Sequence, residues 1–496
     1  MANMEHTPQT ETPFTVLIAG GSIAGLSLAL LLSRAGINYI LLERGNTFTP
    51  QVGASIGWHP PAIGILDQLG LWENDIKPIA VPLHTGKHFT REGVLFGTAK
   101  NHLAVHERLG YPIVFIERKL YLETAFKHIP EEEKKTRLHL NAAVESMAQD
   151  ENGVTVTTID GRTFRGDILI GADGVHSRIR DLISPELKKG MYPMLSSILL
   201  PSGSDMMAGL VAEYNCIFGM SNVTENTPME AGMVYNTYDE GVSNVCASGV
   251  EGKIYWFFFK KSGITHPPDV PRFSNEDMEK LAEQYGSMPM CHEWKLADAW
   301  KAREKAVLVP LEEGVIKKWN ERRVLLVGDA AHKFTINAGF GGNTALESCV
   351  HLSNRLHKLL AGNPNAHPST AELVALFQDF EAVQRPRAES VLNLSAKVTR
   401  LEAQDGMIMK LVSLYVLPRV SDGMKAGIFS GIASTYPDVE YLPLKPMQRK
   451  KKSAKSGMPF AGLLTAAAAV GMAGLFLQSQ YGMEALKVVG SLIAAK

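Results

Sequence analysis

The fold class follows from the stretch FTVLIAGGSIAGLSLALLLSRAGINYILLE, residues 14–43. Its apolar run 14–19 predicts a buried strand, and the leucine-rich run 26–35 predicts a helix that ends at Gly36. A second apolar run, 38–42, predicts another buried strand. Strand, helix and strand in so short a stretch form a βαβ unit, whose two strands lie parallel in one sheet. The sequence therefore predicts an α/β fold built on a parallel sheet.

The turn between the first strand and the helix reads Gly20-Gly21-Ser22-Ile23-Ala24-Gly25. In dinucleotide-binding folds, glycines at this turn permit a tight bend and the close approach of a pyrophosphate. The helix that follows offers free backbone N–H groups to the phosphates. Ser22 stands where the middle glycine of the usual motif would be, and Glu43 ends the second strand, where it can bind a ribose hydroxyl. We therefore expect Gly20, Ser22, Gly25 and Glu43 to bind a dinucleotide, the alternative being a turn without a ligand.

Two more glycine turns follow buried strands further along the chain. The apolar run 167–170 precedes Gly171-Ala172-Asp173-Gly174, and the run 324–327 precedes Gly328-Asp329 and a glycine-rich segment, 337–343. An aspartate at the carboxyl end of a buried parallel strand can hold a ribose or ribitol hydroxyl. A glycine-rich turn that opens a helix can present N–H groups to the pyrimidine end of a flavin. Asp173 and Asp329 are accordingly candidate cofactor ligands.

Composition excludes several classes of protein and raises one question about location. The 496 residues are 45% apolar and 20% charged with a net charge of −1, so no nucleic-acid partner is expected. The four cysteines lack metal-ligand spacing and suit a reducing cytosol.

Residues 457–478 form an uncharged apolar stretch of about membrane-spanning length, roughly 20 residues. They follow a basic cluster made of Arg449, Lys450, Lys451, Lys452 and Lys455.

By the positive-inside rule, this arrangement predicts a C-terminal transmembrane helix that leaves the catalytic body on the cytosolic side, in the endoplasmic reticulum. A buried or amphipathic terminal helix is the alternative, because Ala and Gly dominate the stretch.

With these three motifs in this order, the chain resembles the group A (aromatic-hydroxylase-type) FAD-dependent monooxygenases over roughly residues 14–400. The resemblance implies FAD as cofactor, NAD(P)H as a transient co-substrate and O2 as the oxidant. It implies a Rossmann-type FAD-binding domain at 14–182 and 301–365, and an antiparallel-sheet substrate domain at 183–300. A helical region at 366–448 and the basic linker with its membrane segment at 449–496 would complete the chain.

Other details are similar to the fungal paxM-type epoxidases of terpenoid and meroterpenoid biosynthesis. They are Ser22 in the glycine turn, Gly57 in a small-residue segment, Arg118 in Ile116-Glu117-Arg118, and the run 332–335. That resemblance implies that the residues in contact with FAD include Glu43, Gly57, Arg118, Asp329 and Gly342. The chain departs from the broader family at Ile336, where proline is usual, and at Phe340, where glutamine is frequent. Apolar residues there suit a hydrocarbon substrate.

The expected reaction is epoxidation of an isoprenyl double bond in an apolar terpenoid or meroterpenoid intermediate. Hydroxylation of an aromatic ring on the same fold, a non-oxygenating flavin-binding redox protein, and a flavin reductase of isoprenoid chains are the alternatives. Tyr214 and Tyr235 are candidate catalytic groups near the substrate, against the alternative that each only packs its ring in a sheet. His332 is interpreted as fixing the glycine-rich loop rather than as a general base.

Overall fold

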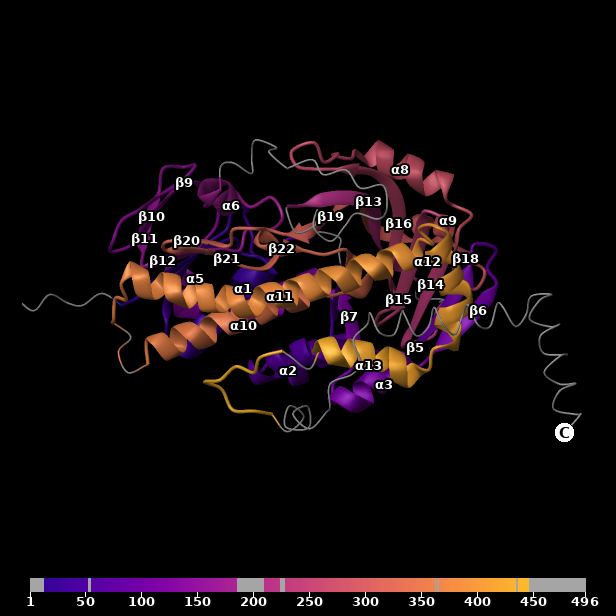
Figure 1. Cartoon of the computed structure of the whole chain (residues 1–496), viewed down its shortest axis with the longest axis horizontal. Helices are drawn as coiled ribbons and strands as arrows, with labels where there is room; N and C mark the ends of the chain where they lie inside the picture. The colour runs from indigo at the N-terminus through magenta and orange to yellow at the C-terminus, as the bar shows by residue number, and fades with distance from the viewer. Residues whose placement is uncertain are drawn as a thin grey trace, which may run out of the picture.

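The computed structural model describes residues 13–51, 55–184, 209–223, 228–361, 363, 365–433 and 436–445 (Figure 1). Two large sheets organise this part of the chain. One is a six-stranded sheet of order β20-β21-β12-β1-β2-β8, and the other is an eight-stranded sheet of order β22-β19-β13-β16-β15-β14-β5-β6. The predicted fold class, a Rossmann-type α/β domain with an antiparallel-rich second sheet, is confirmed.

The six-stranded sheet grows from the βαβ unit read in the sequence. β1 (Thr15–Ala19) pairs in parallel with β2 (Asn38–Leu42) and with β12 (Ile168–Gly171). The remaining strands are β8 (Leu138–His139), β21 (Val324–Leu326) and the antiparallel edge strand β20 (Asn320–Glu321). α1 (Ile23–Ala35) is buried along nearly its whole length and packs on α10 (Gly341–Leu359). This packing explains why α1 is apolar all round instead of amphipathic.

Two small three-stranded sheets flank this domain. One consists of β3 (Ser55–Trp58), β7 (Ile113–Glu117) and β4 (Val81–Leu83), and the other of β9 (Val144–Gln149), β10 (Val154–Thr158) and β11 (Thr163–Gly166). The predicted hairpin at 154–165 is β10–β11, and its turn contains Gly161 at φ +84°.

The eight-stranded sheet extends beyond both predicted limits of the substrate domain, 183 and 300. Its strands are β5 (Thr85–Thr90), β6 (Leu95–Ala99), β13 (Val211–Asn222), β14 (Met233–Asp239), β15 (Val242–Ser248), β16 (Lys253–Thr265), β19 (Arg303–Val315) and β22 (His332–Lys333). β5 joins through a parallel ladder with β14, a pairing between distant segments that no local pattern reveals. A two-stranded sheet, β17 (Pro289–Cys291) with β18 (Trp294–Lys295), lies beside it.

The two faces of the eight-stranded sheet bury different clusters. Along β16, Tyr255, Phe257 and Phe259 belong to an inner cluster, whereas Trp256 and Phe258 belong to an outer one. The outer cluster is covered by α8 (Asn275–Gln284) and α9 (Leu296–Lys301). Side chains alternate along a strand, so the aromatic run of β16 supplies both cores. The inner face is the one that turns toward the FAD-binding domain, because Phe115 and Ile336 pack against it.

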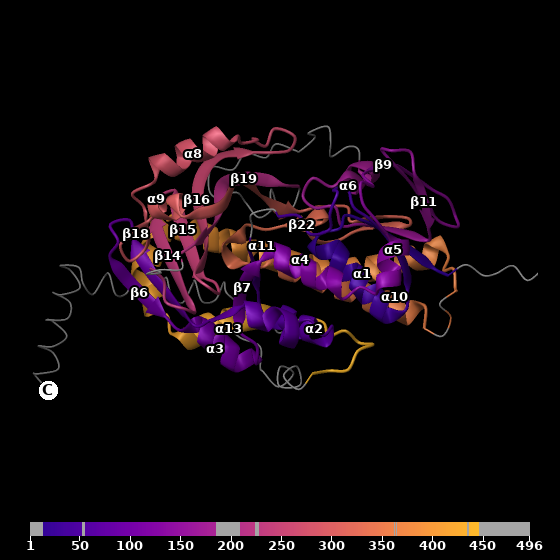
Figure 2. The same ribbon diagram turned by 180° about the vertical axis from the view of Figure 1, so that it is seen from behind.

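The other helices surround these sheets (Figure 2). They are α2 (Pro60–Gln68), α3 (Asn101–Leu109), α4 (Arg118–Lys127), α5 (Glu131–Arg137), α6 (Arg178–Ile183), α11 (Thr370–Glu402), α12 (Met407–Leu411) and α13 (Asp422–Ala433). Short 3-10 or π turns occupy Trp72–Ile76, Lys77–Ile79, Gly328–Ala330, Ile336–Ala338, Val412–Val416 and Leu417–Arg419. α13 packs on α3, where Arg108 donates to the carbonyl of Gly423 over 3.0 Å.

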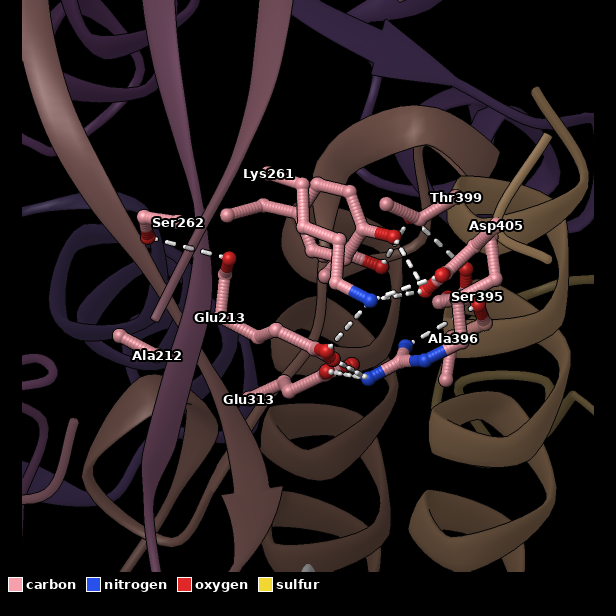
Figure 3. A network of polar contacts seen from close by, with 12 residues as sticks. Ala212, Glu213, Lys261, Ser262, Glu313, Ser395, Ala396, Thr399 and Asp405 are labelled. Carbon is pink, nitrogen blue, oxygen red and sulfur yellow. Dashed lines mark hydrogen bonds and ion pairs between the residues drawn. The ribbon is translucent and has the colours of Figure 1, made fainter. Parts of the chain in front are cut away.

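α11 is a 33-residue helix that contacts both large sheets. In its first half, the side chain of Asn320 next to β21 donates to Glu381 over 2.8 Å. Near its carboxyl end, Arg400 donates to Glu213 of β13 over 2.6 Å and to Glu313 of β19 over 2.9 Å. Lys261 of β16 pairs with Asp405 over 2.7 Å, so helix, sheet and following loop share one network of charges (Figure 3). Buried carboxylates need such partners, because an unpaired charge in the interior is costly.

The predicted transmembrane helix is corrected by the structure. Among the described residues, no helix has both the length and the apolar character needed to cross a membrane. The stretch 457–478, on which the prediction rested, lies outside the described residues.

Arg400→Met keeps the length of the side chain but leaves the carboxylates of Glu213 and Glu313 without their shared partner. Breaking a buried pair from one side costs about 3–5 kcal/mol, so we expect a loss of that order in the free energy of unfolding. Urea denaturation followed by tryptophan fluorescence measures it. The control is Arg165→Met, whose partner Asp150 is exposed, and it should change stability little. Equal midpoints for the two variants would contradict the role given to this network.

Candidate active site

The glycine turn after β1 is shaped by contacts that exclude any side chain. A Cβ at Gly25 would lie 1.8 Å from the carbonyl oxygen of Gly20. Gly20 itself has φ +105°, and a Cβ there would lie 2.5 Å from the carbonyl oxygen of Ala172. Ser22 is the N-cap residue of α1, yet its side chain makes no capping hydrogen bond. The first N–H groups of α1 are therefore left for a ligand, as a pyrophosphate site requires.

Glu43 and Arg118 close this turn from two sides. The Glu43 carboxylate accepts from the backbone N–H of Gly21 over 2.6 Å and from that of Gly45 over 2.7 Å. Arg118, the first residue of α4, donates to Ser22 Oγ over 2.5 Å. Burial lowers the pKa of Arg118, and the negative charges of Asp329 and Glu43 act against that shift. The structure thus brings together Ser22, Glu43, Arg118 and Asp329, which the sequence could only place on separate segments.

The two motif aspartates have different surroundings. Asp329 forms an ion pair with Lys333 and remains partly exposed. The Asp173 carboxylate is occupied within the protein, because it accepts from Ser177 Oγ over 2.5 Å and from the Arg178 N–H over 2.7 Å. It thereby holds the start of α6, and burial raises its pKa. Its predicted contact with the cofactor stays a prediction; the structure gives its carboxylate a structural role.

The glycine-rich loop of residues 335–343, which we call the flavin loop, is fixed by the side chain of Asn343. Asn343 Oδ1 accepts from the His59 N–H over 2.9 Å, and Nδ2 donates to the carbonyls of Gly57 and Gly339 over 2.7 Å each. At the neighbouring Gly342, a Cβ would lie 2.5 Å from Ile56 Cδ1. Gly57 and Gly342 are thus joined where β3 meets the start of α10.

An aromatic stack covers the middle of the flavin loop. The ring of His59 stacks on Phe340 with centroids 4.6 Å apart, and Phe340 stacks on Phe429 of α13 at 6.1 Å. Burial lowers the pKa of His59 to about 4, so this imidazole is neutral at physiological pH. Phe340, where the family frequently has glutamine, is therefore buried within an aromatic stack beside the loop.

The end of α11 holds the other side of the flavin loop. The Thr399 hydroxyl lies 2.8 Å from both Thr335 Oγ1 and Asn337 Oδ1. Asn337 Nδ2 in turn donates to Glu402 Oε2 over 2.5 Å. Burial raises the pKa of Glu402 to about 8, so its carboxyl group is mostly protonated at neutral pH. The helix that crosses both sheets therefore also positions this loop.

The two candidate tyrosines lie on opposite faces of the eight-stranded sheet. Tyr214 belongs to the inner cluster, and its hydroxyl donates to Asp405 over 2.9 Å. Tyr235 belongs to the outer cluster, and its hydroxyl lies 3.3 Å from His292 Nε2. The structure does not bring the two together. Both rings are packed in the sheet, and both hydroxyls have partners within the protein.

His332, next to the third glycine motif, is packed within the protein interior. His332 is buried between Trp319 and Phe334, and its Nε2 lies 3.4 Å from Ser348 Oγ. Burial lowers the pKa of His332 to about 4. This agrees with the interpretation of His332 as part of the support of the loop.

Sequence reasoning missed several residues around the flavin loop. Asn343 follows directly on the glycine-rich motif, so a capping role for its amide could have been expected there. His59, Thr399 and Glu402 gave no such signal, because they reach the loop from segments far away in the chain.

The residues of this region fit FAD. Backbone atoms pack where a Cβ of Gly20 or Gly25 would be, and this tight turn leaves the first N–H groups of α1 open to a pyrophosphate. Arg118 Nε is buried without a hydrogen-bond partner among the described residues, and a phosphate would supply one. The fold and the site are those of a flavoprotein, and the residues that would hold FAD lie between α1 and the flavin loop.

Comparison with known proteins identifies the family. The model of the family described as "FAD binding domain" matches residues 13–370, and the chain belongs to this family. The FAD-dependent monooxygenase janM of Penicillium janthinellum is 34% identical over 414 residues, covering 83% of this chain and 82% of its own. The FAD-dependent monooxygenase ausM of Aspergillus calidoustus is 33% identical over 463 residues, covering 93% and 96%. The predicted class is confirmed: the chain is an FAD-dependent monooxygenase.

Solved structures agree with this fold. Klebsiella pneumoniae HpxO, complexed with FAD and uric acid, superimposes with a TM-score of 0.66 at 19% identity. The match covers 87% of this chain and 98% of that one. At this level of identity the likeness concerns the fold alone.

Gly25→Ala should abolish FAD binding, because the added methyl group cannot coexist with the Gly20 carbonyl 1.8 Å away. The visible flavin absorbance of the purified variant, relative to protein, measures the effect. Gly263→Ala is the matched control, since nothing lies within 4 Å of a Cβ there and its φ is not positive. A Gly25→Ala protein with a full complement of flavin would refute the assignment of this turn.

Glu402 makes the stability of the protein depend on pH. Between the ordinary pKa of 4.5 and about 8, the folded protein keeps a proton that the unfolded chain has lost, so stability falls as pH rises through this window. Glu402→Gln removes this titration and keeps an oxygen for Asn337. The melting temperature of the variant relative to wild type should therefore increase with pH across the window. A difference that stays constant would show that Glu402 is ionised in the folded protein.

Proposed function

We propose that this monooxygenase uses NAD(P)H and O2 to epoxidise an isoprenyl double bond of a terpenoid or meroterpenoid intermediate. The observation that carries the proposal is the apolar wall beside the flavin loop. Ile336 of the loop packs against the inner cluster of the eight-stranded sheet, together with Phe115, Phe218 and Phe429. All four side chains are only partly buried, so apolar surface is offered next to the loop. Such a surface favours a hydrocarbon chain over a polar ring.

The roles of the chain's own residues follow from this geometry. FAD held here would, once reduced by NAD(P)H, use O2 to supply one electrophilic oxygen atom to an electron-rich double bond, and the second oxygen atom would leave as water. The flavin loop, fixed by Asn343 and Thr399, would set where the flavin ring lies, and the apolar wall would hold the alkene and exclude water. Epoxidation needs no protein base, which is consistent with the engagement of Tyr214 and Tyr235 in contacts of their own. The predicted catalytic role of these tyrosines stays a prediction.

The relatives support the class of reaction and leave its substrate as a proposal. Both janM and ausM are named as FAD-dependent monooxygenases, and neither name specifies a substrate. The choice of an isoprenyl double bond therefore rests on the apolar wall and on the resemblance to the paxM-type epoxidases.

Incubation of the purified holoenzyme with NADPH and a farnesylated hydroxybenzoic acid tests the proposal. We expect NADPH oxidation stimulated by the probe and a product that gains one oxygen atom on the farnesyl chain, which mass spectrometry and NMR locate. Under 18O2 the added atom should be labelled. Oxygen on the aromatic ring would instead establish a ring hydroxylase, and a saturated double bond without O2 uptake would establish a reductase. NADPH consumption with no oxygenated product would overturn the proposal.

A further inference from the structure

Three basic side chains from three elements converge on the side of the eight-stranded sheet where β5 meets α3. They are His88 of β5, His102 of α3 and Lys425 of α13, which we call the basic cluster. A Cβ at Gly86 would lie 3.7 Å from both His88 Nε2 and His102 Cε1, so both rings lie within contact distance of one methyl-sized position beside Gly86. Lys425 approaches from the helix packed on α3, and its charge acts on His88.

Among the residues that the structure describes, no acidic side chain forms a hydrogen bond or ion pair with the basic cluster. His102 Nδ1 is buried and makes no hydrogen bond with any described residue. Within the same described part, Lys425 forms no ion pair, and His88 contacts the Tyr238 hydroxyl over 3.1 Å. Burial lowers the pKa of His88 to about 3 and that of His102 to about 4, and it lowers the pKa of Lys425 as well. The two imidazoles are therefore neutral at physiological pH, so a bound anion would find hydrogen-bond donors in the histidine rings and its opposite charge in Lys425.

The acidic groups nearby do not supply this balance. Asp422 lies on α13 itself and raises the pKa of Lys425, but burial outweighs it. Glu402 acts on Tyr238, yet its own carboxyl group bonds Asn337 and has a pKa of about 8, so it is mostly neutral at pH 7. His84 and His59 are the other titratable groups coupled to His102, and both are bases.

The basic cluster is connected to the flavin loop through His59. α3, which carries His102, contacts α2, whose N-cap residue is His59, and the ring of His59 stacks on Phe340 of the loop. Phe429, four residues from Lys425 on the same helix, lies in the same stack. A molecule that reaches from the cluster to the loop would therefore pass along aromatic rings with a basic group at its far end.

We propose that the basic cluster binds an anionic oxygen group, a carboxylate or an acidic enol or phenol, at the end of the substrate opposite to the reacting double bond. The inference rests on the proposed function, because the isoprenyl chain is what extends from the cluster past His59 toward the flavin loop. The site thereby selects prenylated acids over prenylated neutral compounds. The apolar wall holds the chain, and the cluster fixes which end of the molecule faces the flavin.

The test compares two probes on the FAD-loaded enzyme, a farnesylated hydroxybenzoic acid and its methyl ester. Dissociation constants come from quenching of tryptophan fluorescence, and the products come from mass spectrometry. Wild type should bind the acid about tenfold or more tightly than the ester, as expected for a hydrogen-bonded charge. Lys425→Met should remove most of this preference by weakening the binding of the acid. The control Lys410→Met removes an exposed lysine paired with Glu240 and should preserve the preference.

Gly86→Ala is the second variant and guards against a folding defect in α13. Its methyl group lies in ordinary contact distance of its neighbours, so the fold should persist, but it occupies the position within contact distance of His88 and His102. We expect this variant to weaken the binding of the acid more than the binding of the ester. Equal affinity of wild type for acid and ester, or an undiminished acid preference in both Lys425→Met and Gly86→Ala, would overturn the inference. The pH dependence separates the two sources of charge, because the methyl ester can be charged only at its phenol. If the enzyme binds the ester more tightly than the acid above the phenol pKa of the ester, the cluster binds a phenolate. If it binds the acid more tightly at all pH values, the cluster binds the carboxylate.

The two proposals fail in different ways. If the epoxide forms from both probes with no acid preference, the proposed function stands and the basic cluster does not select substrates. If the acid binds preferentially and the variants remove that preference while no epoxide forms, the cluster is a binding site and the proposed reaction is wrong.

Discussion

The position of the flavin loop depends on the end of α11, and the end of α11 depends on one buried arginine. Arg400 joins carboxylates of two adjacent strands of the eight-stranded sheet, and within one helical turn Thr399 and Glu402 reach the loop. Because an unpaired interior charge is expensive, the helix has few alternative placements. The loop is therefore held in register with the sheet whose inner face forms the apolar wall. Cofactor position and substrate position are set by the same contacts.

The parts of the fold that the sequence predicted are those with local patterns. The βαβ unit at residues 14–43 is complete within one stretch, and the structure reproduces it as β1, α1 and β2. The glycine turn was predictable for the same reason, since its glycines are required by contacts among near neighbours such as Gly20 and Gly25. The cofactor role expected of Glu43, Arg118 and Asp329 came from motif position and family resemblance, and only the structure shows that the three lie close together.

The parts that were missed depend on pairing between distant segments. The antiparallel sheet takes in β5 and β6 from before residue 100 and β19 from after residue 300, and no periodicity marks that partnership. The Asp173 carboxylate caps a helix a few residues on, a use that its motif does not reveal. The basic cluster was missed for a similar reason: three isolated basic residues carry no pattern until α3, α13 and β5 meet.

One long helix tied to both sheets also has a mechanical meaning. α11 connects the two sheets: near one end it bonds Asn320 of the FAD-binding sheet, and near the other end it bonds Glu213 of the substrate sheet. Pro386 lies within its span, and even there the helix continues without a break. A hinge motion between the two sheets would have to break this helix or the buried ion pairs of Arg400. The FAD-binding sheet and the substrate sheet are therefore expected to move as one rigid unit, because a single continuous helix is bonded to both.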